Sequence, residues 1–310
     1  MSIVERALQK AQTQRAQPEA TAPGTPAAEA LAQSSAHDGG TPAEVAVATA
    51  TPQVREPGGA ARGERIEIRV AELRSAGRLA PEALAHQTEE EFRRIKWPLL
   101  SAIFGREGAV RASNNVVLVT SAIPGEGKTF NALNLALSIA REPDLEVLLV
   151  DGDVAQPALS SSLGVSGRPG LTDLVVDERL DPADFIHPTS VERLHFLPAG
   201  SRRDNSPELL ASARMASVID GLSRRSTPGV VLFDSPPVLA TNEAQVLSRY
   251  AGQILMVVMA DSTEQRVVTE ALALLDRSKP VSAVLNRVEP SLVSRYYSHY
   301  YYGYGQDRKA

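Results

Sequence analysis

The pattern of hydrophobic and polar positions divides the chain into a polar first part and an alternating second part. From residue 115 onward, short Val- and Leu-rich runs alternate with segments in which apolar residues recur at helical spacing. Continuous apolar runs of this length are typical of strands buried on both faces of a parallel sheet. The predicted strands are residues 115–121, 146–153, 193–200, 229–237, 252–262 and 281–288, and the predicted helices are residues 128–140, 207–224, 242–250 and 263–276. This alternation predicts an α/β fold with a doubly wound, mostly parallel sheet and helices on both faces.

The first part of the chain has a different pattern. Apolar residues within residues 2–15 recur at helical spacing, which predicts a short helix that is marginal without a partner. Residues 17–64 mix Ala, Pro, Thr, Gly and Gln without a period, and no aromatic residue precedes Phe92. Such a segment cannot easily bury enough apolar area to offset its ordering entropy. We therefore expect a disordered leader with a short N-terminal helix over residues 1–85, a folded domain over residues 86–290 and a tail over residues 291–310.

A further helical pattern marks the expected start of the folded domain. Phe92, Ile95 and Leu99 recur at helical spacing within residues 89–104, and Pro98 predicts a bend or a new start there. Three charged residues spaced by three, which share one helix face, lie in the same segment: Glu90, Arg93 and Lys96. A solvated face is the usual fate of such charges.

Composition and charge remove several classes of protein. The formal net charge is -5, so no global basic field would attract nucleic acid, and we expect no nucleic-acid partner. The chain has no Cys, which excludes disulfides, thiol nucleophiles and Cys-ligated zinc. No apolar run approaches the roughly 18 residues of a membrane span, and the first residues carry charges where a signal peptide needs an apolar region. A soluble cytoplasmic protein is the expectation.

A glycine-rich loop lies between the first strand and its helix, in SAIPGEGKT at residues 121–129. Gly125 and Gly127 allow a sharp turn whose N–H groups point inward, at the positive end of the next helix. Lys128 would add a cation for the β- and γ-phosphates, and Thr129 a hydroxyl for Mg²⁺. Ala122 stands where the G-x-x-x-x-G-K-[ST] pattern has its first Gly, but the strand–loop–helix context that the pattern requires is present. The loop predicts a P-loop fold that binds nucleotide.

Acidic residues follow two other predicted strands. Asp151 and Asp153 end one strand, where alternation would aim both side chains to the same side, and Asp234 ends another. Charged groups at the ends of buried strands are costly unless they are paired or bound to a cation. Helix or turn capping is the alternative role for such residues, most of all for Asp153. Three acids beside a phosphate loop predict a site for Mg²⁺ and a nucleotide.

These motifs together resemble those of the bacterial tyrosine kinases that regulate exopolysaccharide and capsule export. The segments that carry the resemblance are TSAIPGEGKT, LLVDGDVAQP, VVLFDSPPVLAT and NSPELLAS, and it covers about residues 89–304. The leader resembles that of autokinases encoded with exosortase-linked export systems. Partition and septum-site ATPases are related, but they carry a signature lysine early in the loop, where this chain has Ile123. That difference favours the kinase branch.

The resemblance implies roles for particular residues. Lys128, Asp151 and Asp153 would be catalytic, the two acids helping to orient Mg²⁺ and to activate a tyrosine hydroxyl. Thr129, Asp151 and Asp234 would hold Mg²⁺. ATP would contact the loop residues Pro124, Gly125, Glu126, Gly127, Lys128, Thr129 and Phe130. Glu90, Arg93 and Lys96 would match an E-x-x-R-x-x-R helix that docks onto a neighbouring subunit in a ring, with Lys96 replacing the second Arg and losing its planar fork.

The tail concentrates six tyrosines without a helical or strand period: Tyr296, Tyr297, Tyr300, Tyr301, Tyr302 and Tyr304. By itself such a segment reads as an adhesive low-complexity tail or a stacking segment for nucleic acid. Beside a phosphate-transfer site it resembles the autophosphorylated tails of the same kinases, modified in trans.

Two functions from different classes remain. The first is an ATP-dependent protein-tyrosine autokinase that regulates exopolysaccharide assembly and export. The resemblance implies for it a separate membrane chain-length protein as activator, a tyrosine phosphatase, and a cytoplasmic location with peripheral recruitment to the inner membrane. The second is a nucleotide-switched adaptor or positioning ATPase of the partition and septum-site class, without kinase activity.

Overall fold

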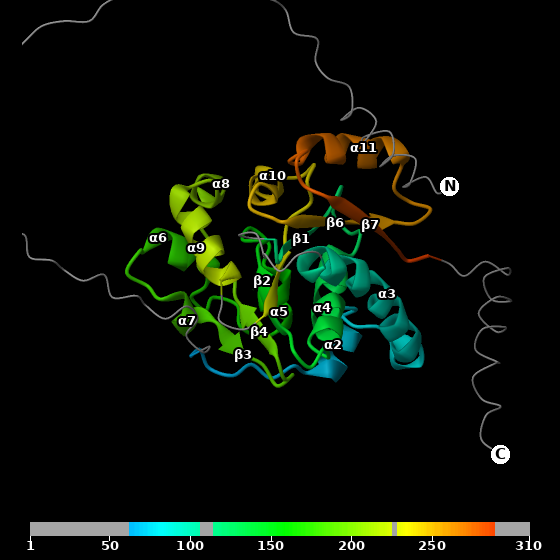
Figure 1. Cartoon of the computed structure of the whole chain (residues 1–310), viewed down its shortest axis with the longest axis horizontal. Helices are drawn as coiled ribbons and strands as arrows, with labels where there is room; N and C mark the ends of the chain where they lie inside the picture. The colour runs from blue at the N-terminus through cyan, green and yellow to red at the C-terminus, as the bar shows by residue number, and fades with distance from the viewer. Residues whose placement is uncertain (1–61, 106–113, 225–227, 289–310) are drawn as a thin grey trace, which may run out of the picture.

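A parallel β-sheet forms the centre of the molecule. The computed structural model describes residues 62–105, 114–224 and 228–288 (Figure 1). Within these residues the sheet has seven strands in the order β3-β4-β2-β5-β1-β6-β7. The strands are β1 (Val116–Ser121), β2 (Glu146–Asp151), β3 (His187–Pro188), β4 (Leu194–Leu197), β5 (Gly229–Asp234), β6 (Gln253–Met259) and β7 (Val281–Asn286). All neighbours pair in parallel except β3 and β4, so the predicted fold class is confirmed.

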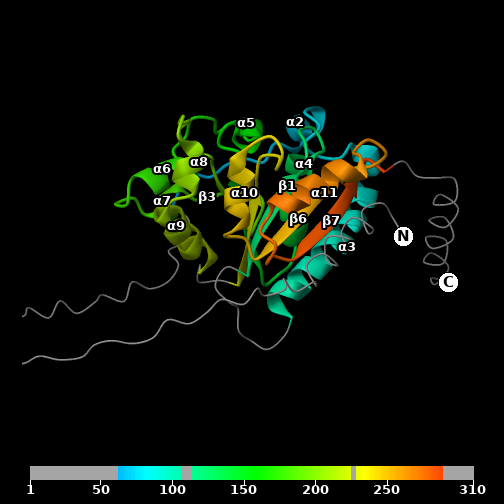
Figure 2. The same cartoon turned by 90° about the horizontal axis from the view of Figure 1, so that it is seen from above.

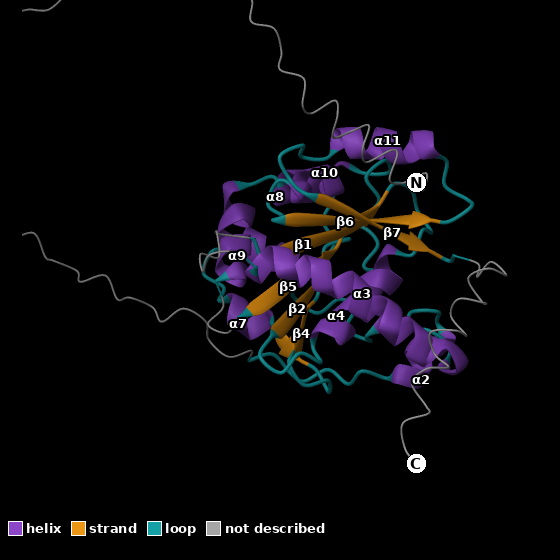
Figure 3. Cartoon of the chain, turned by 45° about the vertical axis from the view of Figure 1, so that its right-hand side comes forward, coloured by secondary structure: helices purple, strands orange, loops and turns teal. Residues whose placement is uncertain are grey.

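Helices cover both faces of this sheet (Figures 2 and 3). One hydrophobic core packs α2 (Val70–Ser75), α3 (Ala85–Phe104), α4 (Lys128–Ile139) and α5 (Ala158–Ser162) against the first face. The other core packs α6 (Leu171–Val176), α8 (Ser206–Leu210), α9 (Ala213–Ser223), α10 (Asn242–Ser248) and α11 (Gln265–Leu274) against the second. The 3-10 helix η1 (Glu82–Leu84) and α7 (Pro182–Phe185) are short connecting pieces. Every residue of β1 is buried, as strands covered on both faces require.

The predicted elements differ from the observed ones in several places, among them the short helices α5, α6 and α7, which the pattern did not predict. The helix expected over residues 207–224 is two helices, because Ser212 caps α9 by accepting a hydrogen bond from the N–H of Met215. α3 continues as one helix through Pro98, so the new start that was one of the two expectations there does not occur. The short strand β3 is an antiparallel edge strand whose two residues carry no periodic pattern.

The described fold begins before residue 86, where the sequence placed the domain boundary. Ile66 forms a parallel bridge with Thr189, and the N–H of Ile68 donates to Ser190 Oγ at 2.9 Å. Leu73 and Leu79 are buried in the same core as α3 and α4. The absence of aromatic residues did not indicate disorder in residues 62–85, because aliphatic side chains of this segment pack into the core. The predicted leader helix over residues 2–15 and the tail over residues 291–310 lie outside the described residues.

Lys96 is not available to a neighbouring subunit. It is 4% exposed, and its ammonium donates to the Ser138 carbonyl at 2.9 Å and pairs with Glu142 at 2.5 Å. These contacts tie α3 to the end of α4. The expected contact face of Glu90, Arg93 and Lys96 is therefore wrong at Lys96, while Glu90 and Arg93 pair with each other at 2.5 Å near the surface.

We predict that Lys96→Ala destabilises the fold. The change leaves the Ser138 carbonyl and the Glu142 carboxylate without their partner, a loss of about 1–3 kcal/mol. The melting temperature should fall by about 2–10 °C. Arg93→Ala, which removes an exposed side chain from the same helix, is the matched control and should change it little. Equal melting temperatures for the two variants would contradict this structural role of Lys96.

Candidate nucleotide site

The phosphate loop joins the carboxyl end of β1 to the first turn of α4. Gly125 and Gly127 adopt positive φ angles of 86° and 94°, a conformation that side chains disfavour. A Cβ on Gly127 would also collide with the side-chain amide of Asn286 at the end of β7. Asn286 Nδ2 donates to the Glu126 carbonyl at 2.8 Å. The loop therefore curves over the first turn of α4 and is held from the far strand of the sheet.

The side chain of Glu126 points into the protein rather than toward a ligand. It is completely buried, and its Oε2 accepts a hydrogen bond from the N–H of Ile123 at 2.8 Å. Its Oε1 accepts from the N–H of Met259 at 3.2 Å and from the Thr263 hydroxyl at 2.6 Å. Glu126 thus fixes the start of the loop to the end of β6. The sequence placed Glu126 among the nucleotide contacts without indicating this bracing role.

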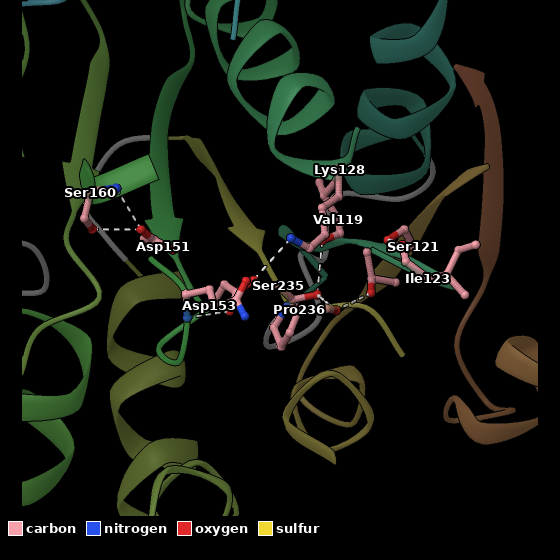
Figure 4. Close-up of polar contacts among 11 residues, drawn as sticks. Val119, Ser121, Ile123, Lys128, Asp151, Asp153, Ser160, Ser235 and Pro236 are labelled. Carbon is pink, nitrogen blue, oxygen red and sulfur yellow. Dashed lines mark hydrogen bonds and ion pairs between the residues drawn. The ribbon is translucent and has the colours of Figure 1, made fainter. Parts of the chain in front are cut away.

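The three predicted acids lie at the ends of the neighbouring strands β2 and β5. Asp151 and Asp234 are directly paired in the register of these strands. Figure 4 shows Lys128 directed from α4 toward Asp153, with Nζ 3.2 Å from Oδ2. Asp151 Oδ2 instead accepts hydrogen bonds from both the N–H and the hydroxyl of Ser160, each at 2.8 Å. Asp151 and Asp153 therefore have different partners, because β2 ends at Asp151 and the strand alternation stops there.

Burial raises the pKa values of the two inner acids. Desolvation raises the pKa of Asp234 to about 7, with the nearby charge of Lys128 acting in the opposite direction. Desolvation likewise raises the pKa of Asp151 to about 6 against the hydrogen bonds from Ser160. Among the described residues, Asp151 Oδ1 and both carboxylate oxygens of Asp234 have no hydrogen-bond partner of normal length, although the Thr129 hydroxyl lies near enough to lower the pKa of Asp234.

These orphaned oxygens fit a divalent cation bound together with a phosphate. Within the described ranges, no group of three His, Cys, Asp or Glu side chains could hold a metal ion without other ligands. Mg²⁺ commonly uses one or two carboxylates and takes its other ligands from substrate phosphates and water. The predicted set of Thr129, Asp151 and Asp234 has that composition, with a buried hydroxyl and two desolvated acids.

A cavity of about 760 Å³ opens in front of the loop. This volume lies within the range of small-molecule sites. Of the predicted residues, the cavity is lined by Gly125, Gly127, Lys128, Thr129, Phe130 and Asp153. The sequence missed other lining residues, among them Arg74, Arg78, Gln156, Ser161 and Asn286. Phe130 also packs against Phe92 of α3, with ring centroids 6.2 Å apart.

A parallel sheet with a glycine-rich loop at the carboxyl end of its central strand defines a P-loop nucleotide-binding protein. No family model matches the chain. The tyrosine-protein kinase Wzc of Salmonella typhimurium is 31% identical over 203 residues, which cover 64% of this chain and 28% of Wzc. The tyrosine-protein kinase YwqD of Bacillus subtilis is 30% identical over 189 residues, which cover 60% of this chain and 77% of YwqD.

A solved structure agrees with these relatives. The kinase domain of VpsO superposes with a TM-score of 0.55 and 28% identity, covering 67% of this chain and all of that domain. The chain belongs to the family of bacterial tyrosine kinases. It spans about a quarter of the length of the larger relatives such as Wzc. Within residues 62–105, 114–224 and 228–288, no helix combines the length and hydrophobicity that crossing a bilayer needs.

We predict that Asp234→Asn stabilises the nucleotide-free protein. Burial raises the folded-state pKa of Asp234 from 3.8 to about 7, so the unfolded chain ionises this group first, and its cost to stability grows between pH 4 and 7. At pH 8 the variant should be more stable by roughly 1–3 kcal/mol, or about 2–10 °C. The difference should shrink toward pH 4. Thermal melting across this pH range is the measurement.

The control for this variant is Asp220→Asn, which changes a carboxylate that forms a surface ion pair with Arg224. It should show little change in stability at any pH. A melting temperature for Asp234→Asn that equals or falls below that of the unaltered protein at pH 8 would contradict the desolvation argument.

We also predict that Glu126→Ala weakens both the fold and nucleotide binding. The change leaves the N–H groups of Ile123 and Met259 without their acceptor, at a cost of about 2–4 kcal/mol. Thr263→Val removes only one of the three hydrogen bonds and should cost less. Denaturant unfolding and titration with a fluorescent nucleotide measure the two effects. Unchanged nucleotide affinity in a folded Glu126→Ala protein would show that the loop holds its shape without this brace.

Proposed function

We propose that the protein is an ATP-dependent tyrosine autokinase that phosphorylates its own C-terminal tyrosines and regulates exopolysaccharide assembly and export. The observation that carries the proposal is the pairing of Lys128 with Asp153 at 3.2 Å in the lining of a nucleotide-sized cavity, with two desolvated acids, Asp151 and Asp234, buried at the strand ends behind it. Membership of the bacterial tyrosine kinase family supports tyrosine as the acceptor. The six tyrosines between Tyr296 and Tyr304 are the proposed acceptors.

The proposed reaction is an in-line transfer of the γ-phosphoryl group of ATP. The tyrosine oxygen forms a bond to the γ-phosphorus while the bond from that phosphorus to the β–γ bridging oxygen breaks, and ADP leaves. Asp153 lines the cavity and accepts the hydroxyl proton, whereas Asp151 is not part of the cavity lining and is held by Ser160. Lys128 exchanges Asp153 for the phosphates when ATP binds, which frees the carboxylate for this role.

The loop and the cation ligands complete the proposed site. The backbone N–H groups from Gly125 to Phe130 surround the phosphates at the start of α4, and Pro124, which has no N–H, shapes the loop before them. Thr129, Asp151 and Asp234 are the proposed ligands of Mg²⁺, which when bound supplies positive charge to the phosphate oxygens. Because Asp234 is completely buried, its carboxylate would be oriented before substrate arrives.

The acceptor tail would come from a neighbouring copy of the chain. Glu90, Arg93 and Trp97 lie at i, i+3 and i+7 on α3, and Trp97 is 53% exposed. Exposed Trp and Arg side chains are enriched at interfaces, and we propose that this face, without Lys96, docks onto the next subunit in a ring. The proposal places the protein in the cytoplasm, where ATP is available, with a membrane chain-length protein as activator and a tyrosine phosphatase to reverse the modification.

A positioning ATPase without kinase activity is less well supported. Such ATPases carry a signature lysine early in the loop, and this chain has Ile123 at that position. The N–H of Ile123 donates to the carboxylate of Glu126. An aliphatic side chain there cannot donate to a phosphate of a second subunit's nucleotide.

We predict that Lys128→Ala lowers tail phosphorylation by at least about 100-fold, because it removes charge stabilisation from the transferring group. The full chain is incubated with Mg-ATP, alone and with a candidate activator segment, and phosphotyrosine is measured by mass spectrometry. Lys279→Ala, in the loop before β7, is the control and should retain activity. Tail phosphorylation that persists in Lys128→Ala would contradict the site.

Mixing two variants, neither of which can phosphorylate its own tail, tests transfer between chains. One carries Lys128→Ala with an intact tail, and the other carries Phe at all six tail tyrosines with an intact site. Phosphate should appear on the tail of the Lys128→Ala chain. ATP hydrolysis by the unaltered protein without any phosphotyrosine, with the activator present, would instead support the positioning ATPase.

A further inference from the structure

Two arginines from the N-terminal segment line the cavity in front of the phosphate loop. Arg74 lies in the last turn of α2, and Arg78 lies four residues further on, before η1. Both line the cavity together with Gly127, Lys128 and Asp153. These two arginines form one wall of the cavity. They come before α3 in the chain, and the sequence pattern placed the start of the folded domain at α3, so it gave no reason to connect Arg74 and Arg78 with the site.

The backbone of this wall is firmly held. Gly77 adopts a φ of 67°, which turns the chain so that the N–H of Arg78 donates to the Leu73 carbonyl at 2.8 Å. Asn134 of α4 donates from Nδ2 to the Arg78 carbonyl at 3.1 Å. Leu73 and Leu79, on either side of the turn, are 1% and 8% exposed. The position of Arg78 relative to α4 is therefore set by the core and not by its own charge.

Among the residues that the structure describes, no carboxylate pairs with the guanidinium of Arg78. Its Nε donates to the Ser162 hydroxyl at 3.1 Å. Arg74, in contrast, pairs with the exposed carboxylate of Glu82 at 2.9 Å. A partly buried arginine without a carboxylate retains donors that can bind a planar or tetrahedral oxyanion in a bidentate manner.

Ser162 indicates which part of a bound nucleotide Arg78 would face. It lies on α5, two residues after Ser160, which holds Asp151. Asn286 contacts the loop from β7, on the other side of β1 in the sheet order. Arg78 thus contacts α5, the helix whose Ser160 holds Asp151, and it lines the same cavity as Lys128 and Asp153.

We propose that Arg78 binds the terminal phosphate of a nucleoside triphosphate, as a cation supplied by the same chain from outside the phosphate loop. The inference rests on the proposed nucleotide function and extends it to a residue that the loop motif does not include. The anchored backbone, the lack of a paired carboxylate among the described residues and the contact with α5 all support this role. Arg74, already paired with Glu82, contributes charge to the cavity without being required for the contact.

The test compares triphosphate and diphosphate binding in the full chain. Affinities for a non-hydrolysable ATP analogue and for ADP, each with Mg²⁺, are measured by calorimetry for the unaltered protein and for Arg78→Ala. We expect Arg78→Ala to weaken the triphosphate roughly 5- to 30-fold and ADP less than about 3-fold, as loss of one charge-assisted contact implies. Arg78→Lys should lie between the two, because it keeps the charge and loses the fork.

The control is Arg69→Ala, which removes an arginine paired with Glu72 at the start of α2 and outside the cavity lining. It should leave both affinities unchanged. Equal affinities in Arg78→Ala and the unaltered protein would overturn the inference, and so would an equal loss for ADP and the triphosphate analogue. Melting temperatures show whether each variant is folded, and Arg78→Lys provides the comparison if Arg78→Ala is not.

Binding and kinase activity separate the two proposals. A selective triphosphate loss in a protein that never phosphorylates tyrosine would support the role of Arg78 while contradicting the autokinase. If the tail is phosphorylated but Arg78→Ala does not change triphosphate affinity, the autokinase proposal is supported and the role of Arg78 is contradicted.

Discussion

The burial of Asp234 without a hydrogen-bond partner of normal length is the constraint on which the site depends. A carboxylate removed from water is costly, and this cost appears as a pKa raised to about 7. Parallel strand pairing sets it directly opposite Asp151, a second desolvated acid. The nucleotide-free protein thus retains two acids that only a cation or a proton can satisfy. Lys128 is the nearby charge that lowers the pKa of Asp234, and a bound cation would do so more strongly.

A rigid loop is the second requirement of such a site. The loop must present its N–H groups at one place, yet it contains two glycines that would otherwise give it many conformations. Glu126 and Asn286 reduce that freedom, the first by a buried carboxylate that accepts from the N–H of Met259 at the end of β6, the second by a side-chain amide at the end of the adjacent strand β7. The conformation of the loop is thus fixed by contacts with the ends of β6 and β7. These strands lie outside the glycine-rich motif that the sequence shows. Preorganisation of this kind lets binding energy go to the phosphates rather than to ordering the loop.

The sequence predicted the sheet and the central residues of the site because both leave local signals. Apolar runs mark buried strands, and SAIPGEGKT joins a strand to a helix in a recognisable spacing. It could not predict the partners of Lys96 or Arg78, since these depend on packing between distant segments. A charged residue at helical spacing looks solvent-exposed until the neighbouring helix is known, and Lys96 is buried against α4. The segment before residue 86 was missed for a related reason, because four scattered aliphatic residues give no period.

The segment before α3 forms one wall of the cavity in front of the phosphate loop. Its aliphatic residues anchor it to the same core as α4, so any shift of the loop helix is felt at Arg78 through Asn134. The cavity thereby gains positive charge from a part of the chain outside the strand–loop–helix unit. A P-loop that relied on Lys128 alone would have one cation for Asp153 and for the phosphates. In its proposed role, Arg78 is a second cation on an anchored backbone that would relieve this competition, because Lys128 could then leave Asp153 as the phosphates enter.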